Sequence, residues 1–240
     1  FSSGPTNVCG ALTVNTTWTP AESPYILTCD VTVNTGVTLT ILPGTIVKFN
    51  ATSRRLIVNG TLIAQGTATS KIYFTSFKDD SVGGDSNGDG AATIAAPGDW
   101  STILVNDTGM ATLSYSHVRY GGYSSTYYAN LYLTQNATVS VDNSIFSNSS
   151  YYGIRLNNTT SGKTSHLTIT SSSIQNNNNK GGYVYTTSGG LSEVVLTGSI
   201  IQNNGNSGFE TNNVIGLTFI NNQLINNAGY AAYLNLAGNA

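Results

Sequence analysis

The chain has 240 residues, and only 8% of them are Asp, Glu, Lys or Arg, about a third of the usual share. The net charge is −2, and no basic stripe is available to neutralise phosphates, so we exclude nucleic acid as a partner. No apolar run reaches the roughly 18 residues of a membrane-spanning helix. Abundant Thr, Asn, Ser and Gly favour strands joined by tight turns, and an apolar share of 39% argues against disorder.

The N-terminal segment, residues 1–35, is expected to form a cap region. The chain begins at Phe1 rather than Met, which we interpret as a mature chain after removal of a signal peptide, with an arbitrary boundary as the alternative. Cys9 and Cys29 are the only cysteines, and no further Cys or nearby His completes a zinc site. We predict that they form a disulfide, rather than two unrelated buried thiols, which would indicate an extracellular setting.

An acidic segment, residues 77–99, separates two apolar runs and is predicted to be a loop insertion. Its stretch 85–90 has the D-x-N-x-D-G spacing that opens an EF-hand loop. Position twelve of that motif is Ala96 rather than Glu, so another carboxylate would have to complete the site. We predict a structural Ca²⁺ ion, and the alternative is a solvated loop. The candidate ligands are Asp79, Asp80, Asp85, Asn87, Asp89 and Asp99.

The second half of the chain carries an internal repeat. Each unit has two apolar strand residues before an apolar anchor residue, then a turn and a third apolar strand. The anchors lie 27, 29, 27 and 23 residues apart, at Val118, Ile145, Ile174, Ile201 and Leu224. Because one such unit cannot bury its inward face alone, stacked copies are expected to share a core. The period and the three short strands predict one coil of a parallel β-helix per unit.

Asn residues recur three positions after the anchors and are predicted to form a ladder at one turn. In stacked coils their side chains would lie about 4.8 Å apart, and Asn tolerates the left-handed conformation of a sharp turn. The alternative is a set of solvated loops. The predicted ladder consists of Asn148, Asn177, Asn204 and Asn227.

The repeats resemble the right-handed parallel β-helix of the pectate-lyase-like superfamily. Segments 37–49, 56–66, 72–76 and 98–100 resemble the start of such domains in secreted and cell-surface proteins. The resemblance implies an all-β chain with a single right-handed parallel β-helix over residues 1–240. It is poor for function, because this fold carries many unrelated activities.

No catalytic constellation is evident along the repeats. In the resembled superfamily, lyases typically combine a carboxylate-bound Ca²⁺ with an Arg or Lys base, and hydrolases need two acids at a set separation. After Thr108 the only acidic residues are Asp142, Glu193 and Glu210, and they lie at different offsets from their anchors. We therefore predict that the protein is not an enzyme and assign no catalytic residue.

Two surface features bear on binding. The 14 Tyr residues are clustered, and exposed ones could stack on sugars or bury at an interface, although many are expected to be ordinary strand residues. Glycosylation motifs occur about as often as chance predicts, and Asn148 is the poorest candidate because of its place in the ladder. The other possible glycosylation sites are Asn15, Asn50, Asn59, Asn106, Asn136, Asn157 and Asn158.

These patterns favour an extracellular, non-catalytic structural or adhesive β-solenoid at the cell surface. No charged residue follows Glu210, so an open C-terminal coil could stack on other copies head to tail, into a filament or surface layer. The competing explanation for that end is a longer surface protein. The alternative function is a carbohydrate-binding or polysaccharide-cleaving module with surface glycans as partners. An ice-binding surface is disfavoured, because the short Thr runs at Thr32, Thr38 and Thr40 do not continue as a regular ladder along the later sequence.

Overall fold

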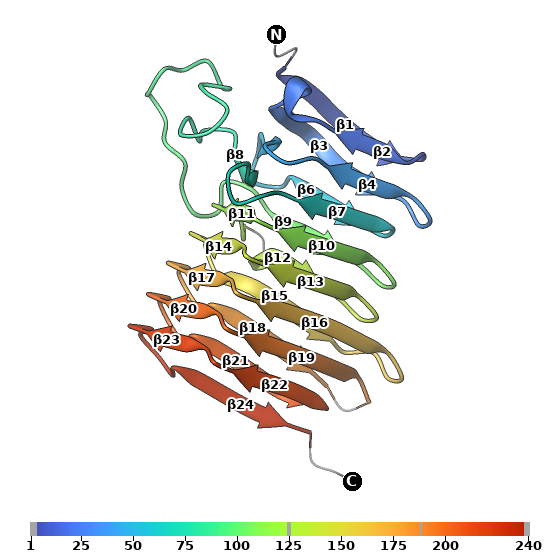
Figure 1. Ribbon diagram of the computed structural model, residues 1–240, viewed down its shortest axis with the longest axis vertical. Helices are drawn as coiled ribbons and strands as arrows, with labels where there is room; N and C mark the ends of the chain where they lie inside the picture. Colours follow the sequence, from blue (N-terminus) through green and yellow to red (C-terminus); the bar gives the residue numbers. More distant parts are fainter. Residues whose placement is uncertain (1–3, 124–125, 188, 238–240) are drawn as a thin grey trace.

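The computed structural model describes residues 4–123, 126–187 and 189–237. Short strands are wound into stacked coils, with the N-terminus at one end of the stack and the C-terminus at the other (Figure 1). Strand pairs along the whole stack are parallel. The predicted all-β class and the parallel β-helix with three strands per coil are therefore confirmed.

One side of the stack is an eight-stranded sheet to which each coil contributes one strand. Its order along the stack is β2 (Thr16–Trp18), β4 (Thr38–Ile41), β7 (Thr61–Gln65), β10 (Met110–Ser114), β13 (Thr138–Asp142), β16 (Thr164–Thr170), β19 (Leu191–Thr197) and β22 (Gly216–Ile220).

A second sheet bends around the rest of the stack and forms two faces. The first face contains β5 (Ile46–Phe49), β8 (Ile72–Ser76), β11 (Ser116–Arg119), β14 (Ile145–Ser147), β17 (Ser173–Gln175), β20 (Ile200–Gln202) and β23 (Gln223–Ile225). The second face contains β6 (Arg55–Val58), β9 (Thr102–Val105), β12 (Ala129–Leu133), β15 (Tyr152–Asn158), β18 (Gly182–Thr186), β21 (Phe209–Val214) and β24 (Ala232–Leu236).

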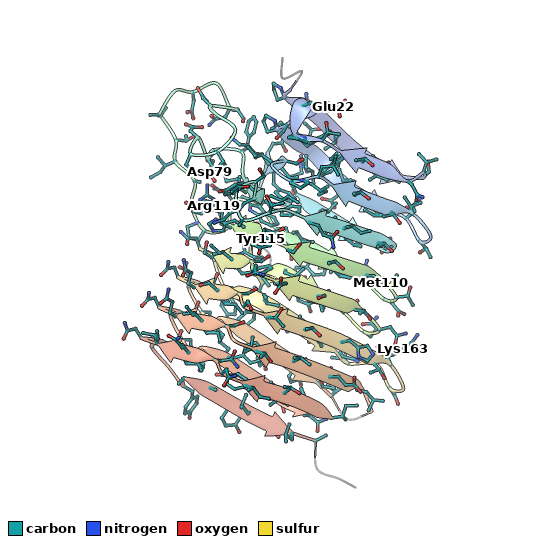
Figure 2. The ribbon with its side chains drawn as sticks, viewed as in Figure 1. Glu22, Asp79, Met110, Tyr115, Arg119 and Lys163 are labelled. Atoms are coloured by element: carbon teal, nitrogen blue, oxygen red, sulfur yellow. A yellow bond between two sulfur atoms is a disulfide. The ribbon has the colours of Figure 1, made fainter. Side chains whose placement is uncertain are left out.

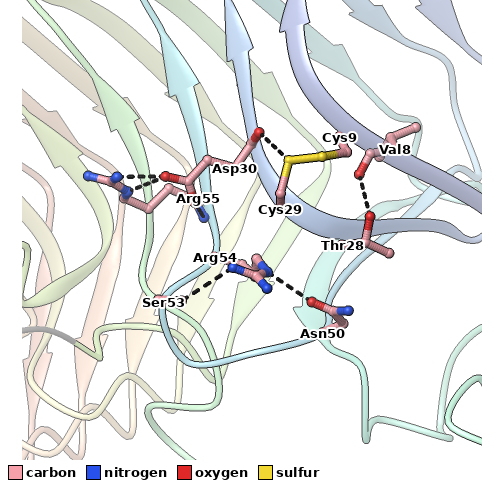
Figure 3. The surroundings of a disulfide bond; sticks show 9 residues. All are labelled: Val8, Cys9, Thr28, Cys29, Asp30, Asn50, Ser53, Arg54 and Arg55. Carbon is pink, nitrogen blue, oxygen red and sulfur yellow. Dashed lines mark hydrogen bonds and ion pairs between the residues drawn. A yellow bond between two sulfur atoms is a disulfide. The ribbon is translucent and has the colours of Figure 1, made fainter.

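The expected N-terminal cap region continues the stack as a regular coil. It holds β1 (Thr6–Leu12), the short 3-10 helix η1 (Pro20–Glu22) and β3 (Tyr25–Val33), and β3 extends over both faces of the second sheet. β1 pairs with β3 in parallel. The predicted Cys9–Cys29 disulfide is formed where the register of this pair shifts (Figure 3).

The core follows from the alternation of apolar and polar residues in each strand. In β13, Val139 and Val141 point inward and are buried, while Thr138 and Ser140 point outward. Equivalent inward residues of neighbouring coils stack in columns, so the core is one continuous cluster from Trp18 to Val214. This arrangement leaves the outward residues and the turns to provide the surface chemistry.

An Asn ladder lies at the turn between the first and second faces. The Oδ1 atom of Asn204 accepts hydrogen bonds from the backbone N–H and the amide of Asn177, at 3.1 and 2.9 Å. Asn227 binds Asn204 in the same way, at 3.1 and 2.8 Å. At the other end, the backbone N–H of Ser149 donates to Asn177.

Asn148 does not belong to this ladder, so its assignment was wrong. Phe146, rather than Ile145, pairs with Ile174 in the neighbouring coil. The ladder position of this coil therefore falls on Ser149. Asn148 instead has a positive φ of 53°, a left-handed turn conformation that Asn tolerates better than most residues.

A second buried ladder lies at the turn before the first face. The backbone N–H groups of Ser116, Ser144 and Ser172 each donate to the hydroxyl of the serine in the next coil, at 3.0 to 3.1 Å. The series ends with Ser199, whose N–H donates to the Asn222 side chain. These side chains satisfy backbone donors that water cannot reach.

The Asn ladder provides a stability prediction. Asn204→Ala should lower the free energy of unfolding by about 2–4 kcal/mol, because it leaves the buried N–H of Asn177 and the carbonyl of Ile174 without their side-chain partner. Asn178→Ala, at an exposed position of the same turn, should change it by less than about 0.5 kcal/mol. Urea unfolding measures both, and equal effects would contradict the role of the ladder.

Candidate functional sites

The acidic loop, residues 77–99, projects from the stack between β8 and β9 (Figure 1). Two of its predicted calcium ligands are bound to cations of the protein instead. Asp79 forms an ion pair with Arg119 at 2.6 Å where the loop meets the coils (Figure 2). Asp99 accepts hydrogen bonds from Lys78 at 2.8 Å and Ser76 at 2.7 Å. Neither carboxylate lies in the acidic cluster described below, so the six predicted calcium ligands do not all lie together.

The environment of Asp79 keeps its carboxylate charged. Burial alone would raise the pKa of Asp79, but hydrogen bonds from Ser81 and Thr75 and the charge of Arg119 outweigh burial and lower this pKa. The carboxylate therefore supports the ion pair at neutral pH.

The other acidic residues of the loop come together. Carboxylate oxygens of Asp80, Asp85 and Asp89 all lie within 4.8 Å of one another. Asn87 joins them, because its amide donates to Asp89 at 2.8 Å. These four residues could hold a hard cation, since all of them offer oxygen ligands.

Lys48 attaches the base of the acidic loop to the coils. This lysine of β5 is fully buried, and its ammonium group donates to the carbonyls of Asp79 at 2.9 Å and Gly84 at 2.8 Å. Burial lowers the pKa of Lys48, while the charges of Asp79 and Asp80 act in the opposite direction. Sequence reasoning missed this contact, because Lys48 alternates with inward residues as any exposed strand lysine would.

Among the described residues, His117 and Ser147 form a contact that resembles the His–Ser pair of a catalytic triad. Nε2 of His117 lies 2.9 Å from the Ser147 hydroxyl, but no carboxylate in the described part of the chain is hydrogen-bonded to the imidazole. Burial, together with the charges of Arg119 and Lys71, lowers the pKa of His117 to about 4. The imidazole is therefore neutral at physiological pH.

The half-buried His117 predicts acid sensitivity. In the unfolded chain His117 titrates near its ordinary pKa of 6.5, so the unfolded state takes up a proton that the folded state excludes until about pH 4. Stability should fall by at most about 3 kcal/mol as the pH drops through that window. His117→Gln should remove this contribution, as measured by urea unfolding at several pH values.

His166→Gln is the matched control. His166 is exposed on the eight-stranded sheet, where it lies 3.0 Å from Glu193. If the two variants keep the same acid dependence as the unmodified protein, His117 is not its source.

The three acidic residues of the repeats do not converge. Asp142 lies on β13 and accepts from Thr170, Glu193 on β19 contacts His166, and Glu210 on β21 is paired with Lys180. A glycosidase needs two carboxyl groups facing one sugar. These residues offer no such pair.

Several tyrosines line a cleft on the second face. Its volume is about 690 Å³, and it lies where the chain enters β6, β9, β12 and β15. None of the described residues that line it is acidic. Its lining includes Arg55, Tyr123, Tyr127, Tyr128 and Tyr151, with hydroxyls of Ser53, Ser101 and Ser150. Sequence reasoning noted the clusters but not the cleft, because its residues come from four coils.

Two arginines lie against these rings. Arg55 is 5.4 Å from the centre of the Tyr127 ring and is paired with Asp30 at 2.6 Å (Figure 3). Arg155 lies between 5.3 and 5.9 Å from four Tyr ring centres, including those of Tyr128 and Tyr152. In the described structure no carboxylate forms an ion pair with Arg155. The cleft and its border are thus aromatic and cationic.

The tyrosine hydroxyls near Arg155 remain protonated. Burial is the main cause that raises the pKa values of Tyr132, Tyr152 and Tyr183, and the charge of Arg155 offsets it only in part. At neutral pH these groups can therefore donate as well as accept hydrogen bonds.

The Asn residues of the glycosylation motifs differ in their exposure to solvent. Asn158 is fully buried, and its amide nitrogen donates to two backbone carbonyls, which argues against a glycan there. Asn59 and Asn106 are hydrogen-bonded to each other at 2.9 Å. Asn15 and Asn50 are exposed. Glycosylation at Asn15, Asn50, Asn59 and Asn106, and at the half-exposed Asn136 and Asn157, stays a prediction.

Residues 101–240 match the family model described as the right handed beta helix region. The chain therefore belongs to the right-handed β-helix family. No curated protein and no solved structure matches it. The described part of the chain contains no helix with the length and hydropathy needed to cross a membrane. Because this fold occurs in enzymes and non-enzymes alike, function has to be argued from the sites.

Proposed function

We propose that the protein is an extracellular, non-catalytic adhesive β-solenoid that binds glycans in the tyrosine cleft. The cleft itself carries this proposal: several tyrosines and serine hydroxyls converge there, and no carboxylate is among the described lining residues. Apolar ring faces with a few convergent polar groups are typical of small-ligand sites. The Cys9–Cys29 disulfide supports an oxidising, extracellular location.

The chemistry of the cleft suits a sugar. Tyr123 and Tyr151 are 52% and 37% exposed, so their rings are available to the apolar faces of pyranose rings. Serine and tyrosine hydroxyls can exchange hydrogen bonds with sugar hydroxyls. A rigid stack of coils holds these groups in place, which reduces the ordering cost of binding.

The same lining supports binding without cleavage. Hydrolysis of a glycosidic bond needs a proton donor and a second carboxylate beside the bond. Asp30 is paired with the lining residue Arg55 and is not itself among the described lining residues. We therefore expect no release of reducing or unsaturated ends from bound polysaccharides.

A glycan array followed by titration of the best ligand tests the proposal. Tyr123→Ala and Tyr151→Ala should each weaken binding by about tenfold, since a lost ring contact is worth about 1 kcal/mol or more. Tyr230→Ala, at a 65% exposed position far from the cleft, should bind as the unmodified protein does. Absence of any ligand on a broad array, or an equal loss in all three variants, would refute the proposal.

A second candidate function is head-to-tail assembly with other copies of the chain. The last coil leaves apolar side chains in solvent: Ile225 is 37% exposed, Leu234 41% and Leu236 55%. An open parallel edge with apolar residues favours pairing with another strand.

The first coil offers matching strands. Residues 6–8 of β1 lie on the first face and residues 10–12 on the second, while β2 ends the eight-stranded sheet. At the opposite end, β23, β24 and β22 close the same three rows. Stacking a second copy would thus continue each sheet in parallel, and such a heterologous contact produces a filament when it does not close.

Light scattering after size-exclusion chromatography tests the assembly. The protein should form species larger than 25.1 kDa as its concentration rises, and Leu234→Lys with Leu236→Lys should suppress them by placing charges at the open edge. Ile94→Lys, in the acidic loop and 79% exposed, is the control. A monomer at every concentration would rule out the filament.

A further inference from the structure

Three oxygen atoms of the acidic loop are shielded from solvent and lack a hydrogen-bond donor. They are the Oδ1 atoms of Asp80, Asn87 and Asp89. Among the described residues only seven buried side-chain nitrogen or oxygen atoms lack a partner, so three of them within this short stretch form a local cluster. Leaving such an atom unsatisfied costs about 1–3 kcal/mol, and more for a charged group. A cation at this point would give all three oxygen atoms a partner.

The surrounding geometry concentrates negative charge. The carboxylates of Asp80, Asp85 and Asp89 approach within 4.8 Å, a separation at which like charges repel. Asp85 is fixed in place by the backbone N–H groups of Gly88 and Gly90, each at 2.8 Å. The fold thus holds three carboxylates together although no side-chain cation in the described structure pairs with them.

We propose that Asp80, Asp85, Asn87 and Asp89 bind one Ca²⁺ ion. All four offer oxygen, the ligand atom that Ca²⁺ prefers, and carbonyls or water would complete its six to eight ligands. The absence of His and Cys from this set disfavours zinc. Asp80 precedes the EF-hand-like stretch and supplies the carboxylate that Ala96 cannot provide at position twelve.

The ion would hold only the tip of the loop. The base is secured without it, through the contacts of Lys48 with Asp79 and Gly84 and through the Arg119–Asp79 and Lys78–Asp99 ion pairs. Removing Ca²⁺ should therefore loosen residues 85–93 and leave residues 78–80 attached to the coils. This division distinguishes a true site from a general effect of salt on stability.

Equilibrium dialysis of the intact protein against radioactive calcium tests the site. After EDTA treatment the protein should bind one ion, and Asp85→Asn and Asp89→Asn should each weaken binding at least about tenfold by removing a charged ligand. Asp107→Asn changes a carboxylate outside the loop that is 43% exposed, and it should leave the affinity unchanged. No binding at millimolar calcium, or an equal loss in all three variants, would overturn the proposal.

Hydrogen exchange provides the second measurement. Calcium should slow exchange at residues 85–93 in the unmodified protein and not in Asp85→Asn, while residues 78–80 exchange slowly in both. Circular dichroism reports whether the variants keep the β-helix. Equal protection at the base and the tip in a folded protein would contradict the proposed division of the loop.

Discussion

The structure depends on the requirement that each coil satisfy the backbone groups of the next. Parallel strands expose N–H and C=O groups along their edges, and in a stack these groups can be paired only by a neighbouring coil in register. The two ladders extend this rule to the turns, where strand pairing stops. The side chains of Asn204 and Ser172 each accept a hydrogen bond from a backbone N–H of the neighbouring coil, about one repeat away in sequence. Side chains at the turns are therefore as constrained as those of the core.

The candidate sites lie where this constraint is interrupted. Both the acidic loop and the segment that lines the cleft connect the first face with the second, the turn that carries the Asn ladder in later coils. In the cleft coil, Asn130 replaces the ladder: its Oδ1 accepts from Gly121 and its amide donates to Ser147 and Val118. Because Asn130 belongs to the following strand, the coil stays closed without a ladder residue in the turn. The longer turn can therefore provide side chains that bind a ligand.

The sequence allowed the fold to be predicted because the period, the apolar anchors and the turn residues agree with one another. The assignment of Asn148 failed over a single residue. Val139 and Val141 precede Phe146 by the same seven and five positions that separate strand residues from anchors elsewhere, so the correct anchor was available. The Ser ladder was equally visible, two positions before each true anchor, but serine is so common in this chain that its recurrence did not stand out.

The sites were less predictable because they depend on which residues the register brings together. Residues 77–99 contain several carboxylates, and the sequence does not show which of them lie together. In the three-dimensional structure Asp79 and Asp99 have cationic partners, from another strand and from the loop itself, and neither belongs to the cluster around Asp85. The register also forms an outward column on the eight-stranded sheet that runs through Thr40, Ile63 and Thr112. Its members are short, whereas the column through Tyr132, Arg155, Tyr183 and Glu210 on the second face consists of long side chains.

This difference between faces explains why the second face is the better binding surface. Long side chains repeated once per coil lie about 4.8 Å apart along the stack, and Arg155 lies 5.3 and 5.8 Å from the centres of the Tyr132 and Tyr183 rings, its neighbours in the column. Each ring then restricts the rotamers of its neighbours before any ligand arrives. A ligand in the adjoining cleft meets side chains whose entropy has already been lost on folding, so more of its contact energy appears as affinity.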